Sequence, residues 1–272
     1  MPIVCLHEKQ RIEAFLRRDP LLHVYELGDL DEFYWPYTTW YGLEEDGTLL
    51  ALALFYTGLT LPVLLAYARD PWDAPRRLLE GLVPRLPPRF YAHLSGDLAR
   101  VFAARYDLHS RGVHCRMALR NPSALQSVDT AGVERLTMAE LPEVDALYRE
   151  AYPDTWFEPS MLRTGLYFGL RRDGRLVSVG GVHVHSPAYR VSALGNVATH
   201  PRWRGRGLAK AVCARLCLVL KDSSDAIGLN VKADNQSAIA CYRSLGFERV
   251  ADYGEYDLGW RAPAGQGDDA RE

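Results

Sequence analysis

Two glycines in the last third of the chain, Gly205 and Gly207, stand among basic side chains between a predicted strand and a predicted helix. Glycine lets the backbone adopt positive φ and lets a ligand approach without a Cβ in the way. The first turn of a helix presents free N–H groups, which bind anions. The surrounding positive charge comes from Arg202, Arg204, Arg206 and Lys210. The pattern predicts a pyrophosphate cradle, although by itself it fits a tight turn on a solvated basic face equally well.

The length and composition of the chain limit the classes of protein to consider. At 272 residues, the chain is long enough for two compact units, and its hydrophobic fraction of 48% is ordinary for a globular protein. A net charge of −2 argues against a nucleic-acid partner, which usually demands a strongly basic face. No apolar run approaches the roughly 18 residues of a membrane span, and no leader segment is evident. We therefore expect a cytoplasmic protein without a membrane partner.

The five cysteines are scattered and odd in number, and none forms a CxxC pair. This usage predicts neither a disulfide framework nor a zinc site. Cys213 and Cys217 lie four residues apart on a predicted helix, which could present two metal ligands, but no second pair is evident. We expect the two cysteines to pack in the core and the protein to hold no metal.

The periodicity after residue 132 predicts an α/β domain with a mixed sheet. Strands are expected near 133–136, 167–170, 176–185, 191–199, 227–231 and from 247 onward, and helices over 141–150, 159–164, 207–220 and 236–245. The strands between 167 and 199 should form an antiparallel meander. Residues 121–132 are polar and turn-rich and are expected to form an interdomain linker, while 262–272 have little to bury and are expected to be disordered.

Two stretches of this domain resemble the motifs of the GNAT superfamily of N-acetyltransferases. Arg202, Gly205 and Gly207 fill the motif Gln/Arg-x-x-Gly-x-Gly/Ala, and the residues from Asn235 to Phe247 fill Asn-x-x-Ala-x-x-x-Tyr-x-x-x-Gly-Phe. The resemblance covers about residues 132–260 and is closest to the branch of the glycine N-acyltransferase-like enzymes. It implies a twisted mixed central sheet flanked by helices. It also implies an acyl-CoA cosubstrate, with acetyl-CoA the first choice.

The resemblance further implies which residues hold CoA. Backbone amides along the loop would bind its pyrophosphate, namely those of Trp203, Arg204, Gly205, Arg206, Gly207 and Leu208, with Arg202 beside them. The backbone of Val197 and Thr199 would pair with the pantetheine arm as a missing strand does. Asn235 would contact the pantetheine or the acyl region; it could instead cap the next helix, or do both.

Catalytic candidates follow from the same resemblance and from acid–base chemistry. Attack of an amine on a thioester expels a thiolate with a pKa near ~8.5, and the phenol of Tyr242, with an ordinary pKa near ~10, can protonate it. A buried tyrosine on a helix otherwise serves as core. The backbone N–H of Val197 would stabilise the oxyanion.

The base that deprotonates the amine is not evident, because Ala193 lies where many relatives carry a carboxylate. His183 and His185 alternate along the preceding strand, so both should point to one face; they are either bases or polar residues on an exposed face. Asp154 and Glu158, in an aromatic loop, are further candidates. Ordered water or the free amine itself could also suffice. We expect a structural role for His200.

Residues 1–120 are predicted to form a degenerate copy of the same domain. The stretch 64–71 resembles 194–201, and 90–106 resembles 227–246. Pro75 and the absence of glycine would prevent pyrophosphate binding at the position of the loop, and Phe102 stands where the second copy has Tyr242. The aromatic segment 31–41 could be core, or could wall the acceptor site; an unrelated α/β domain is the alternative for this half.

The chain is therefore expected to contain a GNAT-like domain at 1–120 without a CoA site and a catalytic GNAT domain at 133–261. The expected activity is transfer of an acyl group from CoA to a primary amine of a small molecule or peptide. The alternatives are an acyl-CoA sensor without catalysis, favoured by Ala193, and a nucleotide-binding regulator. The sequence leaves open whether the chain forms a homodimer.

Overall fold

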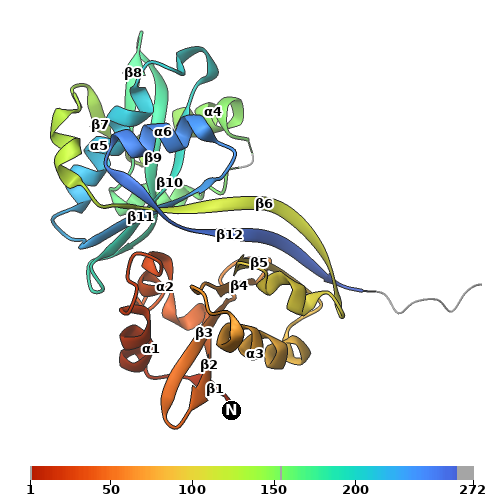
Figure 1. The fold of residues 1–272 in the computed structure, drawn as a ribbon. Helices are drawn as coiled ribbons and strands as arrows, with labels where there is room; N and C mark the ends of the chain where they lie inside the picture. Colours follow the sequence, from red (N-terminus) through yellow and green to blue (C-terminus); the bar gives the residue numbers. More distant parts are fainter. Residues whose placement is uncertain (1, 154, 262–272) are drawn as a thin grey trace, which may run out of the picture. The chain divides into compact units, whose positions relative to one another are not determined.

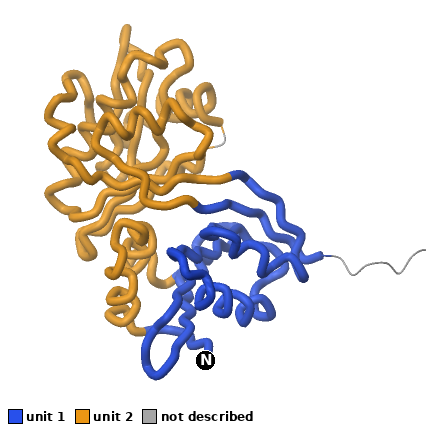
Figure 2. Tube along the Cα trace, viewed as in Figure 1, with its two compact units in different colours: residues 1–7, 37–112, 253–272 blue, residues 8–36, 113–252 orange. Residues whose placement is uncertain are grey.

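A computed structural model describes residues 2–153 and 155–261, and the chain divides into two compact units (Figure 2). Unit 1 comprises the chain up to His7, Tyr37–Gly112 and the chain from Tyr253 onward. Unit 2 comprises Glu8–Pro36 and Val113–Asp252. These boundaries differ from the expected domains at 1–120 and 133–261, because each unit takes in a segment from the other half of the chain. The expected disordered tail, 262–272, lies outside the described residues.

The sheet of unit 2 combines an antiparallel meander with one parallel pair (Figure 1). Its strands are β7 (Val133–Arg135), β8 (Phe168–Arg172), β9 (Arg175–Ser186), β10 (Val191–Thr199), β11 (Ala226–Lys232) and the second half of β6 (Tyr106–Leu119). Neighbours from β7 to β10 are antiparallel, β10 and β11 are parallel, and β11 is antiparallel to β6. The predicted meander and the predicted mixed sheet are confirmed.

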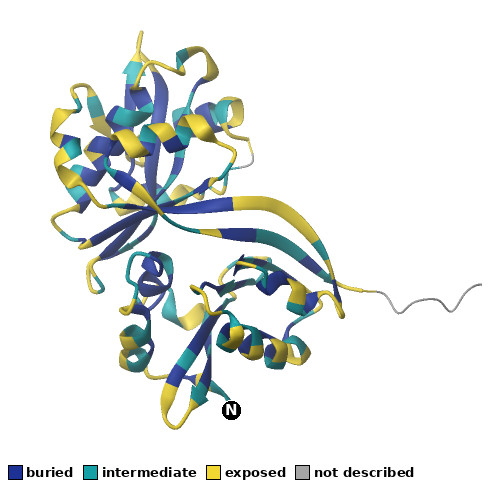
Figure 3. Cartoon of the chain, viewed as in Figure 1, coloured by how far each residue is buried: buried dark blue, intermediate teal, exposed yellow. Residues whose placement is uncertain are grey.

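Helices cover both faces of this sheet. They are α4 (Leu141–Ala151), α5 (Leu208–Leu220) and α6 (Gln236–Ser244). Val177 of β9 packs in one core with Val212 of α5, whereas its neighbour Leu176 packs in another core with Val144 of α4. Because adjacent side chains of a strand point to opposite faces, α4 and α5 lie on opposite faces of the sheet. The central strands between them are mostly buried (Figure 3).

Local sequence explains where these helices begin and end. Gly207 adopts φ 76° as the N-cap of α5, and Gly246 adopts φ 90° just after α6. Cys213 and Cys217 lie in the core beneath α5 with 0% exposure, so the expected packing role is confirmed. The helix expected at 159–164 is a 3-10 helix, Pro159–Thr164.

Unit 1 repeats the same order of pairings. Its strands are β1 (Ile3–Leu6), β2 (Thr38–Glu45), β3 (Thr48–Tyr56), β4 (Val63–Ala66), β5 (Arg89–Ser95) and the second half of β12 (Phe247–Trp260). The neighbours from β1 to β4 are antiparallel, β4 and β5 are parallel, and β5 is antiparallel to β12. As in unit 2, the parallel pair is joined by a helix, α3 (Asp73–Leu82), which packs on the sheet through leucines.

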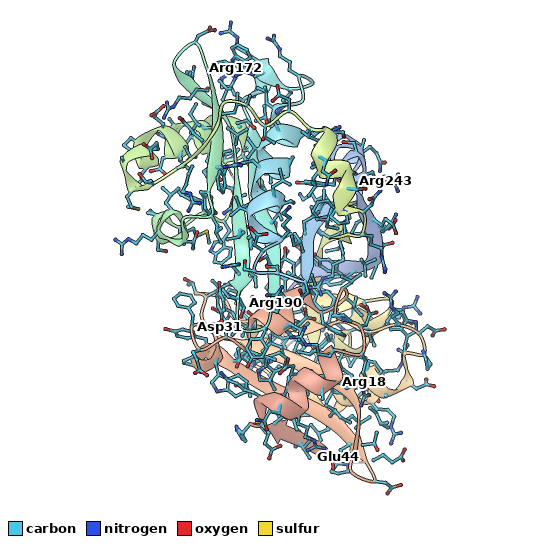
Figure 4. The ribbon with its side chains drawn as sticks, turned by 90° about the vertical axis from the view of Figure 1, so that its left-hand side faces the viewer. Arg18, Asp31, Glu44, Arg172, Arg190 and Arg243 are labelled. Atoms are coloured by element: carbon cyan, nitrogen blue, oxygen red, sulfur yellow. The ribbon has the colours of Figure 1, made fainter. Side chains whose placement is uncertain are left out.

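Two helices from the N-terminal half pack in unit 2 rather than in unit 1. They are α1 (Lys9–Leu16) and α2 (Val24–Gly28), and α2 lies against β10. The approach is close, since a Cβ on Gly28 would lie 2.0 Å from Cγ1 of Val184. Asp31, labelled in Figure 4, follows α2 and accepts a 2.7 Å hydrogen bond from the Ser186 hydroxyl at the end of β9. These contacts explain why residues 8–36 belong to unit 2.

The last strand of each half of the chain is exchanged. β6 closes the first half of the sequence but pairs with β11 over His114–Ala118, within unit 2. β12 closes the second half but pairs with β5 over Tyr253–Gly259, within unit 1. The hydrogen-bonded order of the described strands is β1-β2-β3-β4-β5-β12-β6-β11-β10-β9-β8-β7. No helix among the described residues combines the length and apolar character needed to span a membrane.

The expected linker at 121–132 is also part of unit 2. A 3-10 helix, Pro122–Ser127, occupies half of it, and Leu125 is fully buried in the core beneath α5. The polar, turn-rich composition indicated a linker, but the buried side chain of Leu125 anchors the segment to unit 2.

A fragment comprising residues 121–272 should therefore fail to fold. It lacks the β6 strand that pairs with β11, and it lacks α1 and α2, so it exposes an unpaired sheet edge and apolar surface. We expect aggregation and no cooperative thermal transition by circular dichroism.

Co-expression with residues 1–120 is the matched control, because it returns the missing elements without a covalent link. Recovery of a soluble complex would attribute the failure to those elements. A 121–272 fragment that melts cooperatively alone would contradict the prediction.

Candidate functional site

The two parallel strands at the centre of unit 2 separate halfway along their length. β10 pairs with β11 from Val191 to Leu194, opposite Ala226 to Leu229, and within the described residues no pairing follows. Beyond that point β10 continues along β9, and β11 continues along β6. The backbone of 195–199 therefore has a free edge on the side of β11. An extended chain can form hydrogen bonds there as an added strand does.

A β-bulge lies at the start of this free edge. Gly195 pairs with Gly181 and Ala198 pairs with Val179, so Asn196 and Val197 have no partner in β9. Asn196 adopts φ 55°, in the left-handed region that asparagine tolerates better than most residues. The bulge thus interrupts the register of the ladder at the N–H of Val197.

The direction of that N–H is fixed from the opposite side. The buried hydroxyl of Tyr148, on α4, donates a 2.7 Å hydrogen bond to the carbonyl oxygen of Asn196. In a trans peptide the carbonyl and the following N–H point in opposite directions. The N–H of Val197 consequently points away from Tyr148, as a rigid donor suited to a developing oxyanion.

The glycine loop lies just beyond the end of β10. Gly205 and Gly207 have φ values of 74° and 76°, and a Cβ at either position would meet no atom within 4 Å. The positive φ, rather than a lack of space for a side chain, therefore explains why glycine is favoured at both positions. The loop leads directly into α5, whose first N–H groups have no partner within the helix. This arrangement fits an anionic ligand such as a pyrophosphate.

The side chains of the loop divide into two kinds. Arg204 donates from Nε to the carbonyl of Thr199 and from Nη2 to that of Ala151, both at 3.1 Å, so it ties the loop to the domain. Arg206 stacks over the ring of Trp203, with its guanidinium carbon 4.7 Å from the ring centroid. The guanidinium of Arg204 therefore binds carbonyl groups of the protein itself rather than being aimed at a ligand.

His200 holds the start of the loop in place. Its Nδ1 accepts a 3.2 Å hydrogen bond from the backbone N–H of Arg202, and its Nε2 lies 2.8 Å from Glu150. The side chain is buried and fully engaged, as the expected structural role requires.

The second motif supplies Asn235 and Tyr242. Asn235 Oδ1 accepts a 3.1 Å hydrogen bond from the backbone N–H of Ala238, so the capping alternative for this residue is confirmed. Tyr242 is 8% exposed and packs against the Phe247 ring. Its hydroxyl makes no hydrogen bond to any residue that the structure describes. Burial raises the pKa of Tyr242 well above its ordinary value, so the phenol stays protonated at neutral pH.

His183 lies beside the bulge. Its Nε2 is 2.8 Å from Oδ1 of Asn196, and its ring covers Gly195, where a Cβ would lie 2.2 Å from the imidazole. The ring of Trp156 is 5.6 Å away, centroid to centroid. Burial lowers the pKa of His183 below its ordinary value, so the imidazole is neutral at pH 7.

The expectation that His183 and His185 point to one face is wrong. The register of β9 shifts opposite the step from Ala193 to Leu194, which leaves His183 as an extra residue and breaks the alternation. His185 Nδ1 instead lies 2.9 Å from the Ser192 hydroxyl. Both histidines are half-buried.

The remaining base candidates are unevenly placed. Ala193 is fully buried, and its methyl group offers no base. Glu158 is exposed at the start of the 3-10 helix. Asp154 lies outside the described residues. Of the base candidates that the structure describes, His183 is the one whose side chain contacts the bulge residue Asn196.

Residues 132–247 match the Acetyltransferase (GNAT) family. The strands from β7 to β11, the separated parallel pair and the loop before α5 all lie in this matched part. The fold is that of the GNAT acetyltransferases. The GNAT match does not extend to the first 131 residues.

Relatives extend the comparison. The chain is 29% identical over 158 residues to a mycothiol acetyltransferase of Clavibacter sepedonicus, covering 56% of this chain and 50% of that protein. A GNAT-family acetyltransferase structure from Novosphingobium aromaticivorans shares 24% identity and a TM-score of 0.55, over 77% of this chain and 89% of its own. The matched regions span about half the length, or less, of such curated relatives.

One solved structure bears on both halves of the chain. A tandem GNAT protein from the clavulanic acid biosynthesis pathway aligns over 97% of this chain and 99% of its own, with a TM-score of 0.52 and 15% identity. At that identity the likeness concerns the fold alone. The expectation of a tandem GNAT-like fold agrees with it.

Two contributors to the site were missed by sequence reasoning. They are Asn196 and Tyr148, for which the sequence indicated no role in the site. A hollow of about 320 Å³ adjoins Tyr148 and is lined by Asp145, Tyr148, Arg149, Pro153, Thr155 and Phe157. A single asparagine just after a glycine in a strand was the one signal of a bulge in the sequence.

Proposed function

We propose that this protein is an acyl-CoA-dependent N-acyltransferase that acts on a primary amine of a small molecule or peptide. Acetyl-CoA is the acyl donor that we propose. The separation of β10 from β11 beyond Leu194 carries the proposal, because it opens a backbone edge in line with the glycine loop. The described residues fit CoA at both ends of this path. The loop glycines leave open space for the pyrophosphate, and the free edge accepts the pantetheine amides.

Bound acyl-CoA supplies an activated thioester, and three groups of the chain act on the transfer. The N–H of Val197 donates to the thioester oxygen as negative charge develops on it. The nitrogen of the amine forms a bond to the acyl carbon as the carbon–sulfur bond breaks, and Tyr242 gives its proton to the departing sulfur. The amine loses its own proton to a base. All three steps are proposals for this chain.

His183 is the base that we propose. Its lowered pKa keeps it neutral, and Nδ1 has no hydrogen bond from a described residue. A neutral imidazole with a free lone pair can take a proton from an amine. The carboxylate that Ala193 lacks is thereby replaced from the neighbouring strand.

The variant His183→Gln should lower kcat about a hundredfold, because it removes the proton acceptor and keeps a polar side chain of similar reach. His185→Gln is the matched control and should leave kcat unchanged. In the wild type, a base must be unprotonated to act, so a lowered pKa places the acid limb of the kcat profile below pH 6.5. A limb above that value, or full turnover by His183→Gln, would assign deprotonation to water or to the free amine.

The proposed activity is tested by incubating the full chain with acetyl-CoA and a panel of primary amines while free thiol is measured. Acceptor-dependent thiol release, with an acetylated product identified by mass spectrometry, is the expected result. Tight CoA binding without release from any amine would favour the acyl-CoA sensor instead. Size-exclusion chromatography of the same sample tests the homodimer.

We also propose that unit 1 is a degenerate copy that binds no CoA. The order of its strand pairings matches that of unit 2, with α3 at the place of α5. The first turn of α3 carries Asp73, whose charge repels phosphate, and Pro75, which lacks an N–H. Phe102, at the place expected for Tyr242, is fully buried and has no hydroxyl. One CoA should bind per chain.

A further inference from the structure

The side chain of Asn196 forms several polar contacts in the candidate site, and none of the roles proposed above explains them. Its side chain is 4% exposed. Oδ1 lies 2.8 Å from His183 Nε2 and 3.0 Å from the Thr155 hydroxyl, and Nδ2 lies 2.8 Å from the Tyr167 hydroxyl and 3.4 Å from the sulfur of Met161. Every atom that can form a hydrogen bond in this amide is therefore engaged.

The partners on one side fix the orientation of the amide. Tyr167 donates its own proton to the sulfur of Met161 at 3.3 Å, so its oxygen is left to accept from Asn196 Nδ2. The Thr155 hydroxyl donates to Oδ1. With Nδ2 toward Tyr167 and Oδ1 toward Thr155, the atom that faces His183 is an acceptor.

This orientation determines which imidazole nitrogen of His183 carries the proton. An amide oxygen accepts and cannot donate, so Nε2 must be protonated for the 2.8 Å contact with His183 to be a hydrogen bond. In a neutral imidazole the other nitrogen, Nδ1, then holds a lone pair. If the amide were absent, neither tautomer would be selected by this contact.

We propose that Asn196 is a positioning residue that fixes His183 in the Nε2–H tautomer, so that Nδ1 faces the reaction as an acceptor of protons. The inference rests on the proposed role of His183 as base. It gives the left-handed residue of the bulge two roles, because Asn196 both turns the backbone that precedes the Val197 N–H and sets the proton of the neighbouring imidazole. Asparagine suits both, because it tolerates φ 55° and carries an amide.

The tautomer can be measured directly by NMR on the full chain with ¹⁵N-labelled histidine, with the His183 signals assigned by His183→Gln. The wild type should show one neutral tautomer with the proton on Nε2. Asn196→Gly keeps a backbone that adopts positive φ but has no amide, and it should give a mixture of tautomers. Asn196→Asp keeps an acceptor oxygen and should retain the Nε2–H form. The His185 signals should not change in either variant.

Two NMR outcomes would overturn the assignment: a wild-type proton on Nδ1, or an unchanged tautomer in Asn196→Gly. Should Asn196→Gly fail to fold by circular dichroism, Tyr167→Phe provides the second variant. It removes the oxygen that orients the amide and leaves Asn196 in place, so the tautomer preference should weaken. A preference of wild-type strength in Tyr167→Phe would likewise contradict the proposal.

Kinetics then separate this proposal from the proposed function. Asn196→Gly should lower kcat about tenfold or more, but less than about twofold when His183 is already glutamine, because the two residues act through one proton. A full loss in both backgrounds would mean that Asn196 acts independently of His183, with acyl transfer itself intact. Absence of acyl transfer in the wild type would overturn the proposed function, and the tautomer measurement, which needs no turnover, would then decide the Asn196 assignment.

Discussion

Gly205→Pro should weaken CoA binding at least about a hundredfold, or ~2.8 kcal/mol, while the chain stays folded. Proline fixes φ near ~−65°, and this position has φ 74°. The substitution also removes one N–H from the loop. Since no atom lies within 4 Å of the Cβ position, the damage is confined to the loop. Isothermal titration calorimetry with CoA measures the loss, and the wild type should bind one CoA per chain.

A pair of alanine variants controls for the strain of the left-handed region. Gly174, in the turn between β8 and β9, has φ 75° and is also free of neighbours within 4 Å. Gly174→Ala and Gly205→Ala should each cost about 1–2 kcal/mol of stability. Only Gly205→Ala should reduce CoA affinity. Equal affinity for CoA in Gly205→Pro and the wild type would remove the loop from the binding site.

Tyr242→Phe should lower kcat about 10²- to 10³-fold with little change in CoA affinity. The hydroxyl forms no hydrogen bond within the described part of the chain, so its removal takes no interaction from the fold. Thermal stability should therefore remain that of the wild type or rise slightly. Because the pKa of Tyr242 is raised, the wild type should show no alkaline decline of kcat from this group up to about pH 10, its ordinary pKa.

Tyr106→Phe is the matched control, and its expected effects on stability and kcat are the opposite of those of Tyr242→Phe. Tyr106 is also buried, with 0% exposure, but its hydroxyl donates to the carbonyls of Leu86 and Pro87 in unit 1, each at 3.1 Å. Its loss should cost about 1 kcal/mol of stability and leave kcat unchanged. If Tyr242→Phe also lost stability, and lost kcat and CoA affinity in equal measure, Tyr242 would be a packing residue.

Local patterns in the sequence were enough to predict most elements of unit 2. Apolar spacing from Leu208 to Val219 indicates α5, and the observed helix begins at Leu208, immediately after the left-handed Gly207. Asn235 and Gly246 mark the two ends of α6 as expected. The roles assigned to Val197, Tyr242 and the loop amides remain predictions, since they concern a ligand.

The sequence could not predict which of the two sheets each closing strand joins, because both sheets offer a similar edge. β6 and β12 each have the pattern of a strand that closes a sheet, and nothing in their own residues states which sheet each will close. The helices α1 and α2 pose the same problem. At His183, an extra residue in β9 reverses the alternation on which a face is assigned, and a register shift leaves no mark in the sequence.

The exchange of the closing strands also constrains how the gene can change. A deletion that removed the first half of the reading frame would take away β6 and leave the sheet of unit 2 with an open edge. A substitution that unfolded β6 would therefore damage the sheet of unit 2, although β6 belongs by sequence to the first half of the chain.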